Sequence, residues 1–277
     1  MALAAAALLV AGCTSDGSGP DTGTTPSSPV PSTSATASPS ATPSPAHAVP
    51  TPPGRACYAY EYRAAVAPVT HGDPVPCDQT HTAITFRVGD LDTIVDGHLV
   101  SVDSQRVQDQ VARDCPAAFG DFVGGTEEAR RLTMLRPVWF TPSLHESDQG
   151  ANWYRCDAVA IASDEELAPL VGRLQGVLGR PLARERYAIC GTAAPDSPSF
   201  ERVICAQAHA WKAIRTVDVP GTTYPGVEKA RAAGQQPCQD AANAVADDPL
   251  NYQWGYEWPT ADQWKAGQHY GLCWAPD

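Results

Sequence analysis

The chain has 277 residues, with 31 acidic and 19 basic side chains and a formal net charge of −12 at pH 7. Its length allows one or two domains, and its shortage of lysine and arginine argues against nucleic-acid binding, which needs a cationic surface to displace counterions. No apolar run reaches the roughly 18 residues of a membrane-spanning helix. Nine cysteines indicate an oxidising compartment, and the odd number sets one apart from any disulfide pairs.

Residues 1–13 are predicted to be a lipoprotein signal peptide. The stretch is apolar and ends in Leu9-Val10-Ala11-Gly12-Cys13, which matches the lipobox at which a lipid is attached to the cysteine thiol. An ordinary secretory segment with an incidental cysteine is the alternative, and no lysine or arginine precedes the apolar run. Lipidation of Cys13 would anchor the protein to the extracytoplasmic face of the cell membrane and would account for the odd cysteine.

Residues 14–54 are predicted to be a disordered linker. They are almost entirely serine, threonine, proline, alanine and glycine, and they hold ten of the 26 prolines. Such a segment cannot bury enough apolar surface to offset the entropy of ordering, and its prolines favour extended backbone. We expect a spacer that holds a folded body away from the membrane, and docking of a partner to the proline-rich chain is the alternative.

The other eight cysteines indicate an internal duplication. They form two sets of four: Cys57, Cys77, Cys115 and Cys156, then Cys190, Cys205, Cys238 and Cys273. The second cysteine of each set lies in a V-x-C-x-Q-x-H pattern, at residues 75–81 and 203–209. We expect repeat 1 at 55–162 and repeat 2 at 181–277, joined by a connecting helix at 163–180 in which Ser163 and Glu166 form a capping box.

The same elements are predicted in each repeat. A β-branched run at 82–88 or 214–219 indicates a strand, and a helical pattern follows at 102–114 or 227–233, before the third cysteine. Pro142 and Pro259 suit the first turn of a short helix, Gly150 and Gly267 suit its end, and a last strand carries the fourth cysteine. The fold class is therefore α+β, with two similar disulfide-stapled repeats that contain small mixed or antiparallel sheets and short helices.

Disulfides are the favoured interpretation of the eight cysteines. Four cysteines allow three connectivities per repeat, and we favour neighbouring pairs: Cys57–Cys77, Cys115–Cys156, Cys190–Cys205 and Cys238–Cys273. The repeats differ in the length of the segment between their first and second cysteines, which is easiest to tolerate when a bridge closes that loop. Zinc bound by Cys77, His81, Cys205 and His209 is the alternative, but we expect no metal and no cofactor.

His81 and His209 recur at the same place in the two patterns, so we expect them to do the same job. A structural role, with each side chain bonded to the turn after the second cysteine, is favoured over a pH-sensitive or ligand-contacting role. Beyond them, we find no nucleophile elbow, phosphate loop or metalloprotease helix in the sequence. We therefore expect a protein that is not an enzyme.

Aromatic residues are concentrated within residues 254–274. A core role is favoured, and a carbohydrate- or peptide-docking face is the alternative. The residues that would form such a face are Trp254, Trp258, Asp262 and Trp264.

These motifs resemble the septum-formation-related domain of actinobacterial envelope proteins, which are commonly lipoproteins or single-span membrane proteins. The resemblance rests on V-P-C-x-x-x-H (75–81), V-I-C-x-x-x-H (203–209), Tyr224-Pro225-Gly226 and the run from Pro259 to Cys273, and it covers two tandem copies. It implies a role in cell division. We expect a non-enzymatic, lipid-anchored extracytoplasmic envelope protein with a cell-wall or divisome partner. The alternative function is an extracytoplasmic carbohydrate- or peptide-binding module.

Overall fold

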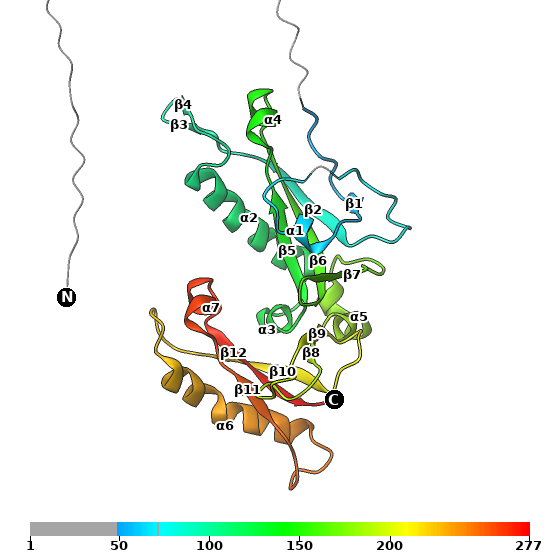
Figure 1. The fold of residues 1–277 in the computed structure, drawn as a ribbon, viewed down its shortest axis with the longest axis vertical. Coiled ribbons are helices and arrows are strands. Elements are labelled where there is room, and N and C mark those ends of the chain that lie inside the picture. The colour runs from blue at the N-terminus through cyan, green and yellow to red at the C-terminus, as the bar shows by residue number, and fades with distance from the viewer. Residues whose placement is uncertain (1–48, 71) are drawn as a thin grey trace, which may run out of the picture. The chain divides into compact units, whose positions relative to one another are not determined.

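Two five-stranded antiparallel sheets organise the computed structural model, which describes residues 49–70 and 72–277 (Figure 1). The first sheet has the order β1-β2-β6-β5, with β7 paired to β6, and the second has the order β11-β12-β10-β8-β9. The first comprises β1 (Cys57–Tyr58), β2 (Ala83–Asp90), β5 (Leu135–Phe140), β6 (Trp153–Ser163) and β7 (Glu166–Ala168). The second comprises β8 (Ile189–Gly191), β9 (Arg202–Ile204), β10 (Trp211–Asp218), β11 (Gly255–Glu257) and β12 (Tyr270–Pro276). These sheets, four disulfides and short helices confirm the predicted α+β class.

The predicted signal peptide, Cys13 and most of the predicted linker lie outside the described residues. The described end of that linker, residues 49–54, has no helix or strand until the turn that begins at Gly54. Val49 nevertheless packs against Phe140, Ala151 and Trp153. Within the described part of the chain, no helix is long and apolar enough to cross a membrane.

The two sheets have the same register around their central strands. Arg87 pairs with Cys156 across β2 and β6, and Arg215 pairs with Cys273 across β10 and β12. A bulge interrupts each pairing just before this position, between Thr85 and Arg87 and between Ala213 and Arg215. A bulge bends a strand and increases its twist, so this shared irregularity is structural evidence for the duplication.

One long helix packs on each sheet: α2 (Gln105–Val123) on the first and α6 (Val227–Val245) on the second. Both helices continue past the cysteine at which the sequence pattern suggested that they end, and each contains a proline, Pro116 or Pro237. A helical proline costs a backbone hydrogen bond. The buried stripe continues regardless at four-residue spacing, through Val107, Val111, Cys115, Phe119 and Val123 in α2. Tertiary packing along this stripe overrides the local penalty.

The short helices α4 (Leu144–Asp148) and α7 (Ala261–Lys265) begin one residue later than the prolines suggest. Ser143 and Thr260 are the N-caps, so Pro142 and Pro259 precede the cap and do not lie in the first turn. Both caps form capping boxes, Ser143 with Glu146 and Thr260 with Gln263. Gly150 and Gly267 follow the helices at φ of 94° and 93°, which favour glycine.

The predicted connecting helix at 163–180 is wrong. Strand β6 runs to Ser163, turns through Asp164 and Glu165, and returns as β7, and only a 3-10 turn (Val177–Gly179) follows. The Ser163 hydroxyl does bond the Glu166 carboxylate at 3.0 Å, but across a hairpin turn. Pro169 cannot sit inside a helix without breaking a bond, and Gly172 and Gly176 adopt left-handed φ values of 70° and 66°.

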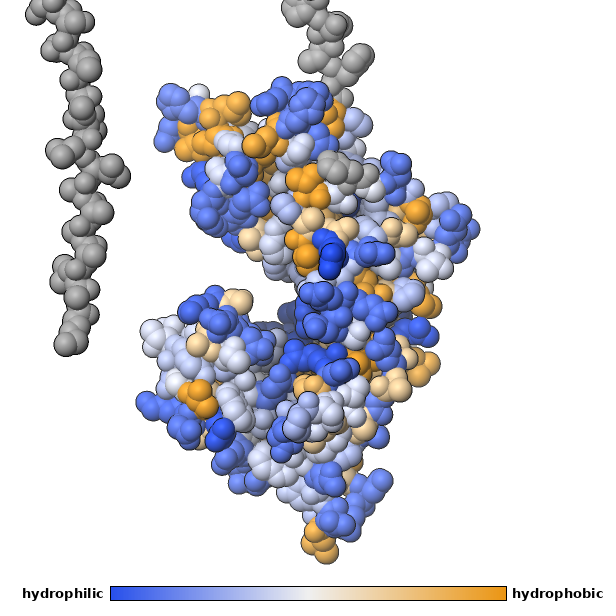
Figure 2. All heavy atoms as spheres, in the orientation of Figure 1, coloured by the Kyte–Doolittle hydropathy of each residue, from blue (hydrophilic) through white to orange (hydrophobic). Residues whose placement is uncertain are grey.

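The remaining described elements are short. They are α1 (Tyr62–Ala65), α3 (Glu127–Arg131), α5 (Pro181–Arg186) and a hairpin of β3 (Ile94–Val95) and β4 (His98–Leu99). Figure 2 shows mainly hydrophilic residues on the viewed face, with apolar residues at the β3–β4 corner, where Leu99 is exposed.

The two repeats share their largest core cluster. Leu135 of repeat 1 and Ile204 and Trp274 of repeat 2 belong to it, together with Leu174 of the connecting segment. Backbone bonds also cross between repeats, from Met134 N–H to Tyr187 O at 2.7 Å and from Ile189 N–H to Leu132 O at 3.1 Å. The repeats are therefore parts of one compact unit.

Candidate functional site

The four disulfides have the predicted neighbouring pairs. Cys57–Cys77 and Cys190–Cys205 each join the first strand of a repeat to the turn that precedes the histidine of the V-x-C-x-Q-x-H pattern. Cys115–Cys156 and Cys238–Cys273 each join the long helix to the central strand. The bridges therefore hold the same two junctions in both repeats.

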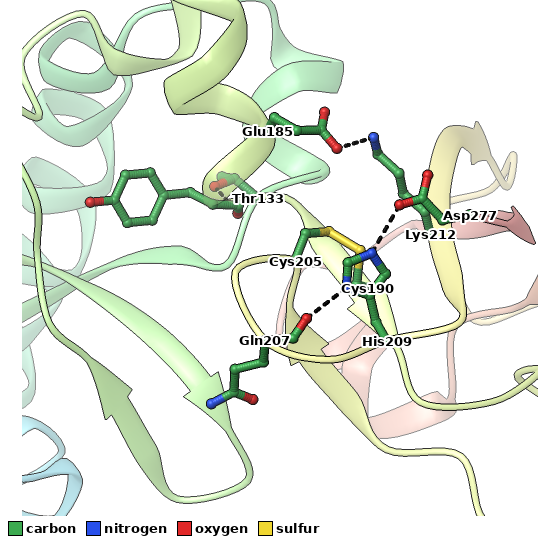
Figure 3. Close-up of a disulfide and its surroundings, with 9 residues drawn as sticks. Thr133, Glu185, Cys190, Cys205, Gln207, His209, Lys212 and Asp277 are labelled. Carbon is green, nitrogen blue, oxygen red and sulfur yellow. Dashed lines mark hydrogen bonds and ion pairs between the residues drawn. A yellow bond between two sulfur atoms is a disulfide. The ribbon is translucent and has the colours of Figure 1, made fainter.

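The two histidines both bond the turn after the second cysteine, as the structural interpretation predicts. The Nδ1 atoms of His81 and His209 lie 2.8 Å from Gln79 O and 2.7 Å from Gln207 O. His81 is buried, whereas His209 places its Nε2 atom 2.9 Å from the carboxylate of Asp277 (Figure 3). The Gln207 carbonyl, followed by Asp277, raises the pKa of His209, because an imidazolium donates from both nitrogens.

The sulfur and imidazole groups beside His209 come close enough to suggest a metal site. One ligand atom each of Cys190, Cys205 and His209 lies within 4.8 Å of the others. The two sulfur atoms are bonded to each other (Figure 3), and metals take the thiolate. Cys77 is likewise bonded to Cys57, so the alternative zinc set of Cys77, His81, Cys205 and His209 has no thiolate in the oxidised protein.

The aromatic residues of 254–264 pack into two small core clusters, whereas Tyr270 and Trp274 join the largest core cluster. Trp264 is buried against Val219 and Ala230 and stacks on His269 at 4.2 Å. Trp254 and Trp258 are half-buried against the cluster around Tyr256. Asp262 is exposed and pairs with Lys265 at 3.1 Å. The geometry fits the core interpretation, and contact of Trp254 or Trp258 with a ligand stays a prediction.

A buried ion pair lies at the centre of repeat 1. The Arg155 guanidinium lies 3.0 Å from the fully buried Asp157 carboxylate and stacks on the ring of Tyr58 at 3.9 Å. Asp157 also accepts hydrogen bonds from Thr85 at 2.7 Å and from Tyr60 at 3.1 Å. Burial raises the pKa of Asp157 even though Arg155 and the two hydroxyls oppose the rise. Its carboxylate oxygens are thus committed to partners in the fold.

A polar pocket lies between the repeats, and we call it the inter-repeat pocket. Its volume is about 550 Å³. Helix α1, β5, β6 and the β6–β7 turn of repeat 1 contribute its lining, together with β9, β11 and α7 of repeat 2 and the residues that precede β5 and β9. The lining residues are Tyr62, Met134, Arg136, Ile161, Ser163, Asp164, Glu165, Phe200, Glu201, Arg202, Glu257 and Gln263. The surface in Figure 2 is hollowed where the two repeats meet.

The two arginines of the inter-repeat pocket have different surroundings. Arg202 pairs with Glu257 at 2.6 Å. Arg136 donates from Nη1 to the backbone carbonyls of Thr133 and, at 2.7 Å, Leu135. Burial, together with the positive charge of Arg202, lowers the pKa of Arg136. This pocket is the strongest candidate for a ligand site in the part of the chain that the structure describes.

A family model described as septum formation matches residues 34–144 and again residues 136–273. The chain belongs to the septum-formation family. The two matches are tandem copies, which confirms the resemblance. No curated protein and no solved structure matches the chain.

Sequence reasoning missed the inter-repeat pocket of this septum-formation protein. Its polar residues differ between the two copies: register equates Glu257 on β11 with Phe140 on β5, and Arg136 with Gln253. The sequence signal that could have located the pocket is a charged residue within a mostly apolar strand of one copy that has no charged counterpart in the other copy. The juxtaposition itself needs the tertiary fold, because the lining draws on residues from both repeats.

Proposed function

We propose that this protein is a non-enzymatic, lipid-anchored extracytoplasmic envelope protein that acts in septum formation by binding a cell-wall or division partner. The observation that carries the proposal is the pair of tandem septum-formation copies, each closed by two disulfides. Structural disulfides persist in oxidising compartments outside the cytoplasm. The lipobox at Cys13 supplies the anchor in this proposal.

A binding role without catalysis is supported by the buried titratable centre of repeat 1. An active site exposes its acid or base to substrate and shifts its pKa for the task. The Asp157 carboxylate is instead fully buried. It pairs with Arg155 and accepts hydrogen bonds from Thr85 and Tyr60. Such an arrangement holds strands together and leaves the carboxylate inaccessible.

Localisation of a fluorescent fusion in living cells tests the septal role. We expect fluorescence concentrated at division sites, and depletion of the protein should change the spacing of septa and the length of cells. Even labelling of the whole envelope, with normal septa after depletion, would contradict the septal role.

Membrane fractionation tests the anchor. The Cys13→Ala variant should leave the membrane fraction because it lacks the thiol that carries the lipid, whereas the neighbouring Thr14→Ala variant should remain there. Retention of Cys13→Ala in the membrane would overturn lipid anchoring and leave the septal role to its own test.

A further inference from the structure

We propose that the inter-repeat pocket binds a small zwitterionic ligand, an amino acid or short peptide with a free carboxylate and a free amino group, and that Arg136 binds the carboxylate. The pocket has a volume of about 550 Å³ and lies between two repeats. Small-ligand sites typically have volumes of about 300–1,000 Å³ and occur at domain interfaces. This proposal goes beyond the septal role and does not depend on the anchor.

Of the two arginines that line the inter-repeat pocket, Arg136 is the one without an acidic partner among the described residues. Its Nη1 group bonds two backbone carbonyls, and no carboxylate of the described residues pairs with its guanidinium. Arg136 is half-buried, and a cation that is partly removed from water without an acidic partner is destabilised. Arg202 faces the same pocket but is neutralised by Glu257 at 2.6 Å. An incoming carboxylate would therefore find its uncompensated charge at Arg136, whose planar fork suits two parallel hydrogen bonds.

The other charges of the lining decide the class of anion. Two arginines face four carboxylates: Asp164, Glu165, Glu201 and Glu257. Two minus four gives a net charge of −2 for the lining, which opposes a phosphate dianion. With Glu257 taken by Arg202, three carboxylates remain to receive an ammonium group. A ligand with one carboxylate and one ammonium matches this pattern.

The rest of the lining supports a ligand with a small apolar body. Met134, Ile161 and Phe200 supply apolar surface, and Gln263 supplies an amide at the start of α7. Burial of apolar atoms beside a few placed polar groups is typical of small-ligand sites. Trialanine, which has methyl side chains and two free termini, is therefore a suitable probe.

Titration calorimetry with the full chain tests the proposal with four probes: trialanine, its C-terminal amide, its N-acetyl derivative and inorganic phosphate. We expect trialanine to bind. Amidation should weaken binding at least about tenfold, because the ligand loses the charged acceptor to which Arg136 donates. N-acetylation should also weaken it, because the carboxylates then lose their cation. No binding of trialanine, or tighter binding of phosphate, would overturn the proposal.

Arg136→Gln should weaken trialanine binding by about tenfold and should remove the discrimination between acid and amide. Arg130→Gln is the matched control, because Arg130 also donates to a backbone carbonyl, that of Gly125, but lies outside the pocket lining. The control should bind like the wild type. Equal loss in both variants would contradict the assignment. Arg136→Lys, which keeps the charge, should retain part of the preference for trialanine over its amide. The amide probe on the unaltered protein tests carboxylate recognition without any variant.

Discussion

In repeat 1 the central strand β6 buries Arg155 and Asp157, whereas the equivalent strand β12 of repeat 2 carries Leu272 and Trp274. The equivalence follows from the register, which places Cys156 and Cys273 at the same position of their sheets. Thr85, which bonds Asp157, is replaced by Ala213 in the second repeat. Repeat 2 therefore has apolar side chains at all three positions at which repeat 1 has Thr85, Arg155 and Asp157.

This difference shows what a duplicated fold can change. A single polar residue left in the core without its partners costs the desolvation of that group, so the residues around Asp157 are interdependent. In repeat 2 Trp274 instead contacts Phe200 edge-on at 5.2 Å and enters the core that both repeats share. The bulge, the two disulfide junctions and the capped short helix are unchanged. These shared features give both repeats the same backbone, whereas the side chains packed in the core differ between the repeats.

The largest expected effect comes from breaking the ion pair of repeat 1. Asp157→Asn should lower the free energy of unfolding by about 3–5 kcal/mol, because it leaves the buried Arg155 without a counter-charge. Denaturant unfolding measures this loss. Asp218→Asn is the control, since Asp218 is exposed and its pair with Arg131 should contribute at most about 1 kcal/mol.

The second prediction gives the core of repeat 1 the apolar character of repeat 2. A triple variant, Thr85→Ala with Arg155→Leu and Asp157→Leu, made in a Tyr60→Phe background, removes the polar groups together. It should recover most of the stability that Asp157→Asn loses, because replacing a buried ion pair by apolar residues is often close to neutral. A triple variant as unstable as the single one would show that the repeats are not interchangeable in this way.

The disulfides should give the next largest effects. Replacing both cysteines of Cys115–Cys156 or of Cys238–Cys273 by alanine should lower the free energy of unfolding by about 4 kcal/mol, and the shorter loops of Cys57–Cys77 and Cys190–Cys205 by about 3 kcal/mol. Sequence separations of 41 and 35 residues, against 20 and 15, set this order. Guanidinium unfolding of the four double variants tests it. A large difference between equivalent bridges would show that the two repeats do not depend equally on their disulfides for stability.

The helix caps should contribute less and equally. Ser143→Ala and Thr260→Ala should each lower the free energy of unfolding by about 1 kcal/mol, since each hydroxyl accepts an amide hydrogen bond at the start of its helix. Ser147→Ala, inside α4, serves as the control and should change little. If only one cap matters, the short helices are not equivalent in energy.

The smallest effect concerns pH and separates the two histidines. The folded-state pKa of His209 is raised, so its contribution is fully present below the unfolded value and is lost as pH rises through the folded value. The unfolding midpoint should therefore fall slightly as pH rises from about 6 to about 8. Asp277→Asn should reduce this dependence because it removes the carboxylate partner of His209. An unchanged pH dependence of the unfolding midpoint in that variant would show that the Asp277 contact does not contribute to it.

Spacing in the sequence was enough to predict the duplication, the disulfide pairs and the histidine turn. These features depend on residues close along the chain or on a repeated pattern: each His Nδ1 bonds a carbonyl two residues earlier. The prediction of a connecting helix was wrong because it relied on an apolar stripe and a capping signal. Pro169, Gly172 and Gly176 instead determine the backbone of this segment.

Only the tertiary structure decided the features that join distant residues. The long helices extend beyond their prolines because the sheet buries their stripe. Asp157 is stable in the core because Tyr60 and Thr85, 97 and 72 residues away in sequence, both donate to it. The inter-repeat pocket exists because residues of β5 and β6 in repeat 1 and of β9 and β11 in repeat 2 line one cavity. Local spacing determines turns, caps and loop closures, but a buried charge and its partners are brought together only when distant strands pack.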